Sequence, residues 1–349
     1  MKDNREKSAV TQFLKKLTIL LLPFFIMMAI YLHDDPFMVL RHYERYDPST
    51  VLLDEDYVGW QTYMNNRDTI PLDSFIMGNS CTMAFPCGEW EKHLEGGRAI
   101  RLFGNAEGII AIYQKLEALD RLHVPIKNVL MVLDKTSLGK CQTSYSHTCI
   151  QPPEVSGISK FKFQETFCQA FFRPGFVIPY FDYKISHKYR PYMQGIINPY
   201  GAIRQPMTND AINPREEMIR KEGEKYWENH KDDFIKKSEP DYRNGKYKEA
   251  PPVLLAKQID LLNKIKGILD KNNTSLKIII SPDFNQVSIN KADLKQLNRI
   301  FGADTVFDFT GINEYTTDIH NYYEKSHYRP VLGIKLMNKI YGSNNDKMR

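Results

Sequence analysis

The chain of 349 residues contains no sustained internal repeat and no low-complexity tract. It also lacks a Cys-x-x-Cys pair and any Cys/His spacing typical of zinc ligands, so we expect no metal site and no cofactor. Net charge is only +5, and basic residues are interleaved with acidic ones almost everywhere. Without a clustered basic face, the sequence argues against nucleic-acid binding.

Long apolar runs are scarce, with one exception near the N-terminus. The run from Leu17 to Leu32 carries no charge and follows Lys15 and Lys16. As a helix it covers about 24 Å, and snorkelling lysines extend it toward the ~30 Å hydrocarbon core of a bilayer. We expect a cytoplasmic basic tail at 1–16 and a transmembrane signal anchor at 17–33.

A cleaved signal peptide is the alternative for this run. No small-x-small cleavage site follows it, because Ala29-Ile-Tyr31 ends in a bulky residue. With the basic flank kept inside, residues 34–349 are expected outside the cytoplasmic membrane, in the periplasm or at the cell surface. Five cysteines fit that compartment. Cys81 with Cys87, or Cys141 with Cys149, could close a small loop, which would leave Cys168 over.

Strand and helix patterns alternate along much of the chain. Nearly continuous apolar runs of strand length are typical of a parallel sheet that is covered on both faces. We expect strands near 75–77, 98–103, 128–133, 276–280 and 305–309, and helices near 107–122, 253–270, 291–301 and 331–341. The predicted fold class is α/β, a three-layer α/β/α sandwich with a five-stranded parallel, flavodoxin-like sheet.

Two stretches depart from this alternation. Residues 47–70 look like a polar, turn-rich approach to the first strand. An aromatic and charged insert occupies about 136–250, where we expect one or two helices at 158–187 over the upper edge of the sheet. A long loop is expected at 188–214.

The first strand runs into the turn Gly78-Asn79-Ser80. Glycine permits a tight backbone there, and the turn places a serine hydroxyl above the carboxyl edge of the sheet, where open α/β sheets bind ligands. Such a turn predicts a nucleophile only weakly, since most Gly-x-Ser turns hold none.

Glu324 and His327 lie three residues apart near the other end of the chain. A carboxylate at this spacing can hold the imidazole Nδ1–H and leave Nε2 to face a serine. The alternative is an exposed ion pair before a helix. Asp318 and His320 form a rival pair, but we expect an Asp-x-His spacing to place these two side chains on opposite sides of an extended loop.

Together, Gly78-Asn79-Ser80, Gly104-Asn105 and Glu324-x-x-His327 resemble blocks I, II and V of the SGNH (GDSL-like) hydrolase superfamily. The chain is most similar to the membrane-anchored, extracytoplasmic branch, which includes alginate O-acetyl transfer proteins and the D-alanyl transfer protein of teichoic-acid modification. The resemblance implies Ser80 as nucleophile, His327 as base and Glu324 as orienting acid. It also implies an oxyanion hole from the backbone N–H groups of Ser80 and Gly104.

Asn105 could add a side-chain donor to that hole, or it could cap the 107–122 helix. Two departures from the family pattern stand out. Glu324 replaces the usual aspartate and is one methylene longer. The Gly-x-Asn-Asp block is missing, and Asp134 stands after the third strand, where it would repel an oxyanion unless it is protonated or turned away.

The resemblance implies an anchored serine acyl esterase or O-acyltransferase that modifies a cell-surface polysaccharide or glycoconjugate. A transferase would need a polytopic membrane partner to deliver the acyl donor, and residues 136–214 would form the acceptor groove. The alternative is a non-catalytic accessory or binding protein in cell-envelope polysaccharide assembly. A chain that shares only the sheet architecture is a third hypothesis.

Overall fold

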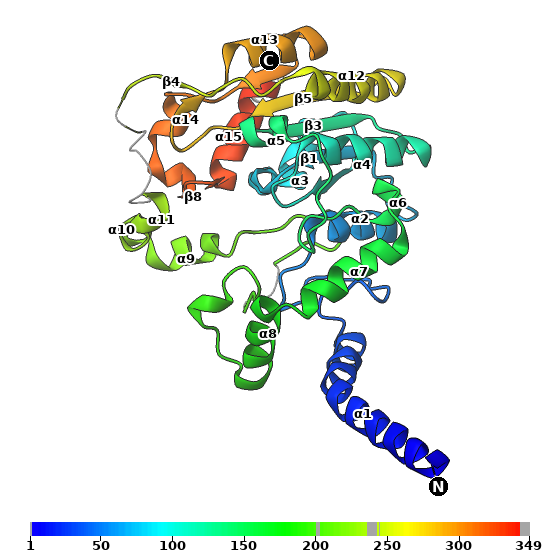
Figure 1. Ribbon diagram of the computed structural model, residues 1–349. Coiled ribbons are helices and arrows are strands. Elements are labelled where there is room, and N and C mark those ends of the chain that lie inside the picture. The colour runs from blue at the N-terminus through cyan, green and yellow to red at the C-terminus, as the bar shows by residue number, and fades with distance from the viewer. Residues whose placement is uncertain (1, 200–202, 236–242, 244, 343–349) are drawn as a thin grey trace.

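The computed structural model describes residues 2–199, 203–235, 243 and 245–342. Helix α1 (Lys2–Asp34) extends away from the body of the protein (Figure 1). From Thr11 to Asp34 this helix is long and apolar enough to cross a membrane, and most of that stretch is exposed, with Tyr31 buried near its end. The predicted span at 17–33 lies inside it.

Five parallel strands form the central sheet in the order β2-β1-β3-β5-β7. The strands are β1 (Ser74–Gly78), β2 (Ala99–Phe103), β3 (Asn128–Leu133), β5 (Ser275–Ile280) and β7 (Val306–Asp308). Every residue of β1 and β2 is buried. The predicted α/β class and five-stranded parallel sheet are confirmed.

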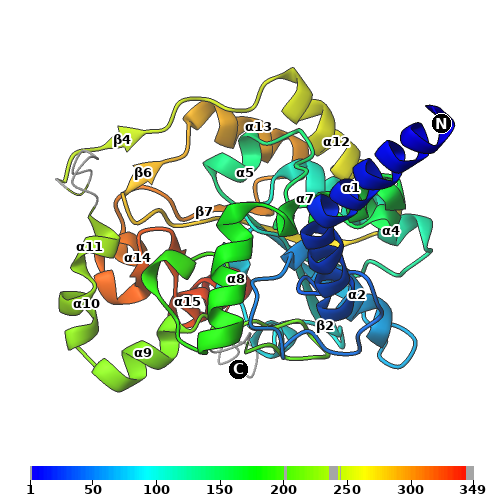
Figure 2. The same cartoon turned by 60° about the horizontal axis from the view of Figure 1, so that its bottom comes forward.

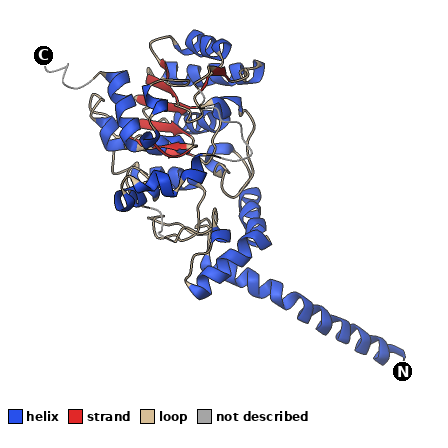
Figure 3. Ribbon diagram, turned by 90° about the vertical axis from the view of Figure 1, so that its left-hand side faces the viewer, coloured by secondary structure: helices blue, strands red, loops and turns tan. Residues whose placement is uncertain are grey.

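Helices cover both faces of the sheet (Figure 3). Successive side chains of a strand point to opposite faces, so Phe75 and Met77 join one core while Ile76 joins the other. The first core includes α4 (Ile109–Arg121), α12 (Ala256–Lys271) and α13 (Lys291–Phe301). The second includes the 3-10 helix η1 (Ser80–Ala84), α3 (Cys87–Glu91) and α15 (Pro330–Tyr341).

The strand order reverses direction next to β1. The chain goes from β1 outward to β2, and then crosses back to β3 on the other side of β1. In open α/β sheets, the crevice at such a switch point, beyond the carboxyl ends of the strands, is where ligands bind. Ser80 follows β1 and Asp134 follows β3, so both lie at that edge.

Residues 47–70 are not the turn-rich approach predicted from sequence, because α2 occupies Glu55–Asn66. Asp54 caps this helix by accepting the backbone N–H groups of Asp56 and Tyr57. The three-residue spacing of Tyr57, Trp60 and Tyr63 then places all three aromatic rings in buried positions. The cap and this spacing were the signals in the sequence.

The insert begins with α5 (Lys135–Gly139) and α6 (Pro153–Ser156), followed by α7 (Lys160–Phe171) and α8 (Pro174–Ser186). The prediction that these last helices cover the edge of the sheet is wrong. They pack on the C-terminal part of α1 and on the segment that follows it, and Figure 2 shows α7 beside α1. Phe24 stacks on Phe172 with ring centroids 5.2 Å apart, and Tyr31 lies 5.2 Å from Phe171. The aromatic residues at the end of α7 therefore pack on apolar residues of α1 and not on the sheet.

Short elements complete the fold. The predicted loop at 188–214 holds only η2 (Pro191–Met193) among its described residues, which exclude 200–202. Three helices follow, α9 (Arg215–Glu222), α10 (Lys225–Asn229) and α11 (Lys231–Phe234). Strands β4 (Lys248–Glu249) and β6 (Val287–Ser288) form a small separate sheet. The chain after β7 contains α14 (Glu314–Thr317), η3 (Ile319–Asn321), β8 (Tyr322–Glu324) and β9 (His327–Tyr328).

All five cysteines are free, so neither predicted disulfide forms. The buried Cys81 thiol faces the Ser326 carbonyl at 3.6 Å, and the buried Cys87 thiol faces the Thr208 carbonyl at 3.7 Å. Each sulfur therefore faces a backbone carbonyl of a different segment and not another cysteine.

Candidate active site

A tight turn after β1 presents Ser80 at the carboxyl edge of the sheet. Gly78 has φ +143°, and a Cβ there would lie 2.1 Å from the Val132 carbonyl oxygen, so only glycine fits. The Asn79 side chain caps η1 by accepting the Cys81 N–H at 2.9 Å. Ser80 is the first residue of η1, so its own N–H has no partner within that helix.

The structure brings Ser80, His327 and Glu324 together. Ser80 Oγ lies 2.7 Å from His327 Nε2, and His327 Nδ1 forms a short hydrogen bond with Glu324 Oε1. Glu324 and His327 pair across the antiparallel hairpin β8–β9, with a register irregularity between Tyr322 and Glu324. The hairpin thus faces the longer glutamate side chain toward the imidazole.

Glu324 is suited to orienting an imidazole. Burial alone would raise the pKa of its carboxyl, but the hydrogen bond and charge of His327 outweigh burial and lower the pKa below its ordinary value. The other carboxylate oxygen accepts the Ser326 N–H at 2.8 Å, which fixes the plane of the group. An ionised, fixed carboxylate on Nδ1 directs the lone pair of Nε2 toward Ser80.

The charged helices of the insert hold this hairpin. The Tyr226 hydroxyl donates to the Tyr323 carbonyl at 2.8 Å, and Trp227 Nε1 donates to the Tyr322 carbonyl at 3.1 Å. Arg329 forms an ion pair with Glu216 at 2.6 Å. Sequence reasoning missed this support, although aromatic residues within a charged stretch were a usable signal.

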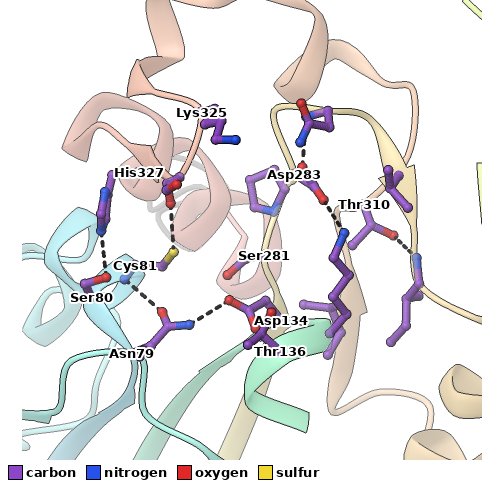
Figure 4. A pocket seen from close by; sticks show the side chains of 18 of the residues that line it. Asn79, Ser80, Cys81, Asp134, Thr136, Ser281, Asp283, Thr310, Lys325 and His327 are labelled. Carbon is purple, nitrogen blue, oxygen red and sulfur yellow. Dashed lines mark hydrogen bonds and ion pairs between the residues drawn. The ribbon is translucent and has the colours of Figure 1, made fainter. Parts of the chain in front are cut away.

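Two hydrogen bonds engage the carboxylate of Asp134. It caps α5, where Oδ1 accepts the Ser137 N–H at 2.7 Å. Its Oδ2 accepts a hydrogen bond from Asn79 Nδ2 at 2.6 Å (Figure 4). Asp134 therefore anchors the Asn79 cap, and through it the turn that carries Ser80.

Two of the predicted oxyanion donors have other acceptors. The Gly104 N–H donates to the Gly78 carbonyl at 3.3 Å, and Asn105 Nδ2 donates to the Thr148 carbonyl at 3.2 Å. Asn105 does not cap the following helix, since Gly108 occupies that position. The oxyanion role of Ser80, Gly104 and Asn105 stays a prediction.

A sealed charge cluster lies behind Gly104. A Cβ at Gly104 would meet the Asp56 carboxylate at 2.2 Å, so Asp56 occupies the space that a side chain would need. Lys115 Nζ contacts Asp56 Oδ1 and Glu107 Oε2, both at 2.7 Å. The signal in the sequence was a lysine on the core-facing side of the amphipathic helix α4, between Ile112 and Leu119.

Burial raises the pKa of Glu107 to about 8, against the opposing effects of Lys115 and the nearby Gly104 amide. Burial by itself would lower the pKa of Lys115, but the two carboxylates raise it. Burial thus favours the protonated form of Glu107, and the two acidic neighbours favour the charged form of Lys115.

The rival histidine pair is also formed, contrary to the sequence prediction. His320 Nδ1 lies 2.8 Å from Asp318 Oδ1, because residues 319–321 form the 3-10 helix η3 and not an extended loop. Its Nε2 lies 3.1 Å from Glu224, so this imidazole pairs with a second acid and not with a serine.

The Ser80–His327 pair borders a cavity of about 440 Å³ at the carboxyl edge of the sheet. In Figure 4, Ser80 and His327 lie on one side of it and Asp283 and Thr310 on the other. The aromatic helices α7 and α8 contribute no lining residue to this cavity. Searches with the sequence found no matching family model and no matching curated protein.

Proposed function

We propose that this chain is a membrane-anchored serine acyl esterase or O-acyltransferase of the SGNH type. The observation that carries the proposal is the hydrogen-bonded chain from Ser80 Oγ through His327 to Glu324, open to a cavity at the switch point of the sheet. Nucleophile, base and orienting acid stand in the order that nucleophilic acyl transfer requires.

The reaction has two steps. Ser80 Oγ attacks the acyl carbonyl while His327 Nε2 takes the hydroxyl proton, and the leaving group departs with that proton. A hydroxyl of a cell-surface polysaccharide or glycoconjugate, or a water molecule, then attacks the serine ester. His327 accepts the proton of the attacking group and returns it to Ser80 Oγ.

A donor for the first step has to reach the outer face of the cytoplasmic membrane, where we place the domain. A polytopic membrane protein that passes acyl groups across the bilayer is the partner this requires. The basic N-terminal tail supports a cytoplasmic start and an extracytoplasmic domain.

One observation favours a second candidate. The Gly104 and Asn105 donors are engaged elsewhere, and Asp134 stands where family members carry a further donor block. A domain without an oxyanion hole would act as a non-catalytic accessory or binding protein in polysaccharide assembly.

The deciding experiment uses the full-length chain in nanodiscs with a fluorophosphonate probe and an aryl acetate. The catalytic proposal expects labelling and turnover in the wild type and loss of both in Ser80→Ala and His327→Ala. A folded wild type that is neither labelled nor active would overturn it and leave the accessory function.

A further inference from the structure

Ser80 and His327 form part of the walls of two cavities at once. The first is the cavity at the carboxyl edge of the sheet, of about 440 Å³. The second has a similar volume of about 440 Å³ and opens on the side of the segment that follows α1. The hydrogen bond between the serine and the histidine thus stands at the boundary between them.

The first cavity, here the polar pocket, carries side chains that recognise hydroxyl groups. Its lining includes Asp134, Lys135, Ser281, Asp283, Asn285 and Thr310. Lys135 and Asp283 form an ion pair at 3.2 Å on its wall, and both are partly exposed. A mixture of charged, amide and hydroxyl groups suits a sugar, whose many hydroxyls need both donors and acceptors.

The second cavity, here the apolar pocket, is walled mainly by hydrocarbon. Its lining includes Val51, Leu53, Met83, Phe103, Ile203 and Ile212. Ile203 and Ile212 are 47% and 51% exposed, so two large apolar side chains remain open to solvent beside a nucleophile. Substrate pockets are typically lined in this way where they hold an apolar group.

Hydrogen bonds keep the walls of the apolar pocket together. The Leu52 N–H donates to the Ile196 carbonyl at 2.9 Å, and the Asn198 N–H donates to the Thr50 carbonyl at 2.7 Å. At its base the buried Arg204 guanidinium pairs with Glu55 at 2.6 Å. The pocket is a built feature that joins the segment after α1 to the loop of the insert.

We propose that the two pockets hold two different substrates. The acyl chain of the donor lies in the apolar pocket, and the sugar hydroxyl of the acceptor enters through the polar pocket. This inference rests on the proposed function and adds the class of each substrate to it.

The two proposed steps account for every bond and proton between the two pockets. In the first step the Ser80 Oγ–acyl bond forms, the bond from the acyl carbon to the donor's leaving group breaks, and the serine proton passes through His327 Nε2 to that group. In the second step the sugar oxygen–acyl bond forms and the Ser80 Oγ–acyl bond breaks. The sugar proton passes through His327 back to the serine.

An acetyl group would leave most of the apolar pocket empty, so the arrangement predicts a preference for longer chains. Each methylene moved from water into an apolar site contributes roughly a fourfold gain at most. We expect kcat/KM for p-nitrophenyl esters to rise from acetate to octanoate in the full-length wild-type chain in nanodiscs.

The test compares two isoleucines that are similarly exposed. Ile212→Asp puts a charge on the wall of the apolar pocket, whereas Ile178→Asp changes a 58% exposed isoleucine of α8 that lines neither pocket. The proposal expects Ile212→Asp to reduce kcat/KM at least tenfold more for octanoate than for acetate. Ile178→Asp should keep the wild-type chain-length profile.

The two failures are distinguishable. If the fluorophosphonate labels Ser80 but the chain-length profile is the same in Ile212→Asp and Ile178→Asp, the pocket assignment is wrong while the serine site stands. If Ser80 is not labelled in the folded wild type, the proposed function itself falls, and the assignment with it.

The acceptor side has its own readout. Methyl hexosides and glycerol should accelerate deacylation of the octanoyl enzyme, and Asn285→Leu in the polar pocket should weaken that acceleration at least fivefold more than Ile212→Asp does. Equal effects of the two variants, or no acceleration by any of these polyols, would overturn the assignment of the acceptor.

Discussion

Two acid–base clusters lie near Gly104, the residue that follows β2, and they differ chiefly in how well solvent and substrate can reach them. In the first, the side chains of His327 and Glu324 are 30% and 17% exposed, and His327 borders the cavity at the carboxyl edge of the sheet. In the second, the side chains of Lys115, Asp56 and Glu107 are at most 4% exposed. Each places a basic nitrogen between oxygen partners at hydrogen-bond distance.

The difference in exposure separates residues that can take part in a reaction from residues that only stabilise the fold. A reacting group has to meet substrate and exchange protons, and His327 Nε2 is placed for both because it faces a hydroxyl at the edge of a cavity. Lys115 can meet neither water nor substrate, so its charge acts on the fold alone, by tying α2, α4 and the Gly104 loop together.

Ser80→Ala is expected to have the largest effect. Loss of the nucleophile should reduce aryl ester turnover at least ~10⁴-fold, while thermal unfolding stays unchanged because the side chain is half-buried at the edge of a cavity. Turnover and melting of the full-length chain measure both. Ser186→Ala, at the end of α8, is the control, and retained turnover in Ser80→Ala would remove the first cluster from the chemistry.

Glu324→Gln should come next, with a loss of ~10²–10⁴-fold in kcat. The amide cannot carry the charge that stabilises the imidazolium, and it leaves the tautomer of His327 unspecified. Because the pKa of Glu324 is lowered, its carboxylate stays ionised wherever an ordinary glutamate does, and it loses its role beside His327 only in more acidic solution. A pH–rate profile in which loss of the Glu324 charge produces an acid limb near pH 7 would contradict this.

Lys115→Met should affect stability and not catalysis. We expect a loss of ~3–5 kcal/mol in the free energy of unfolding. Removal of the ammonium leaves two carboxyl groups facing each other in the core. Lys271→Met is the matched control, because Lys271 pairs with Asp120 at 2.7 Å but is 65% exposed, and surface pairs contribute ~0–1 kcal/mol. Equal losses in the two variants would refute the distinction between sealed and open pairs.

Glu107→Gln should act mainly on the pH dependence of stability. Folded Glu107 holds its proton up to a pKa of about 8, whereas the unfolded residue loses it near 4.5. The folded state binds the extra proton between these values, so this group makes stability fall as pH rises through that window. Urea unfolding from pH 5 to 9 should show a shallower fall in Glu107→Gln, and Glu165→Gln should match the wild type.

The sheet was predictable because each of its strands is a short apolar run bounded by polar turns. Ser80, His327 and Glu324 were predictable from local spacing, but their contact joins residues 247 positions apart and needed the fold. The burial of Lys115 could not be predicted from the sequence pattern, because a buried lysine is stable only with charged partners elsewhere in the fold, here Asp56 and Glu107. The docking of α7 was equally out of reach, because an aromatic face does not reveal which of several apolar surfaces it will cover.

The way α1 joins the domain has a mechanical consequence. Asp35 follows α1 and accepts the backbone N–H groups of Val39 and Leu40 at 3.0 and 2.9 Å, and Phe24 and Tyr31 pack on α7 and its end. The domain is therefore packed rigidly on the end of α1, with no flexible linker between them. If α1 spans a membrane as proposed, these contacts hold both pockets at a fixed height and tilt above the lipid surface, and a donor in the same bilayer would reach them by lateral diffusion and rotation.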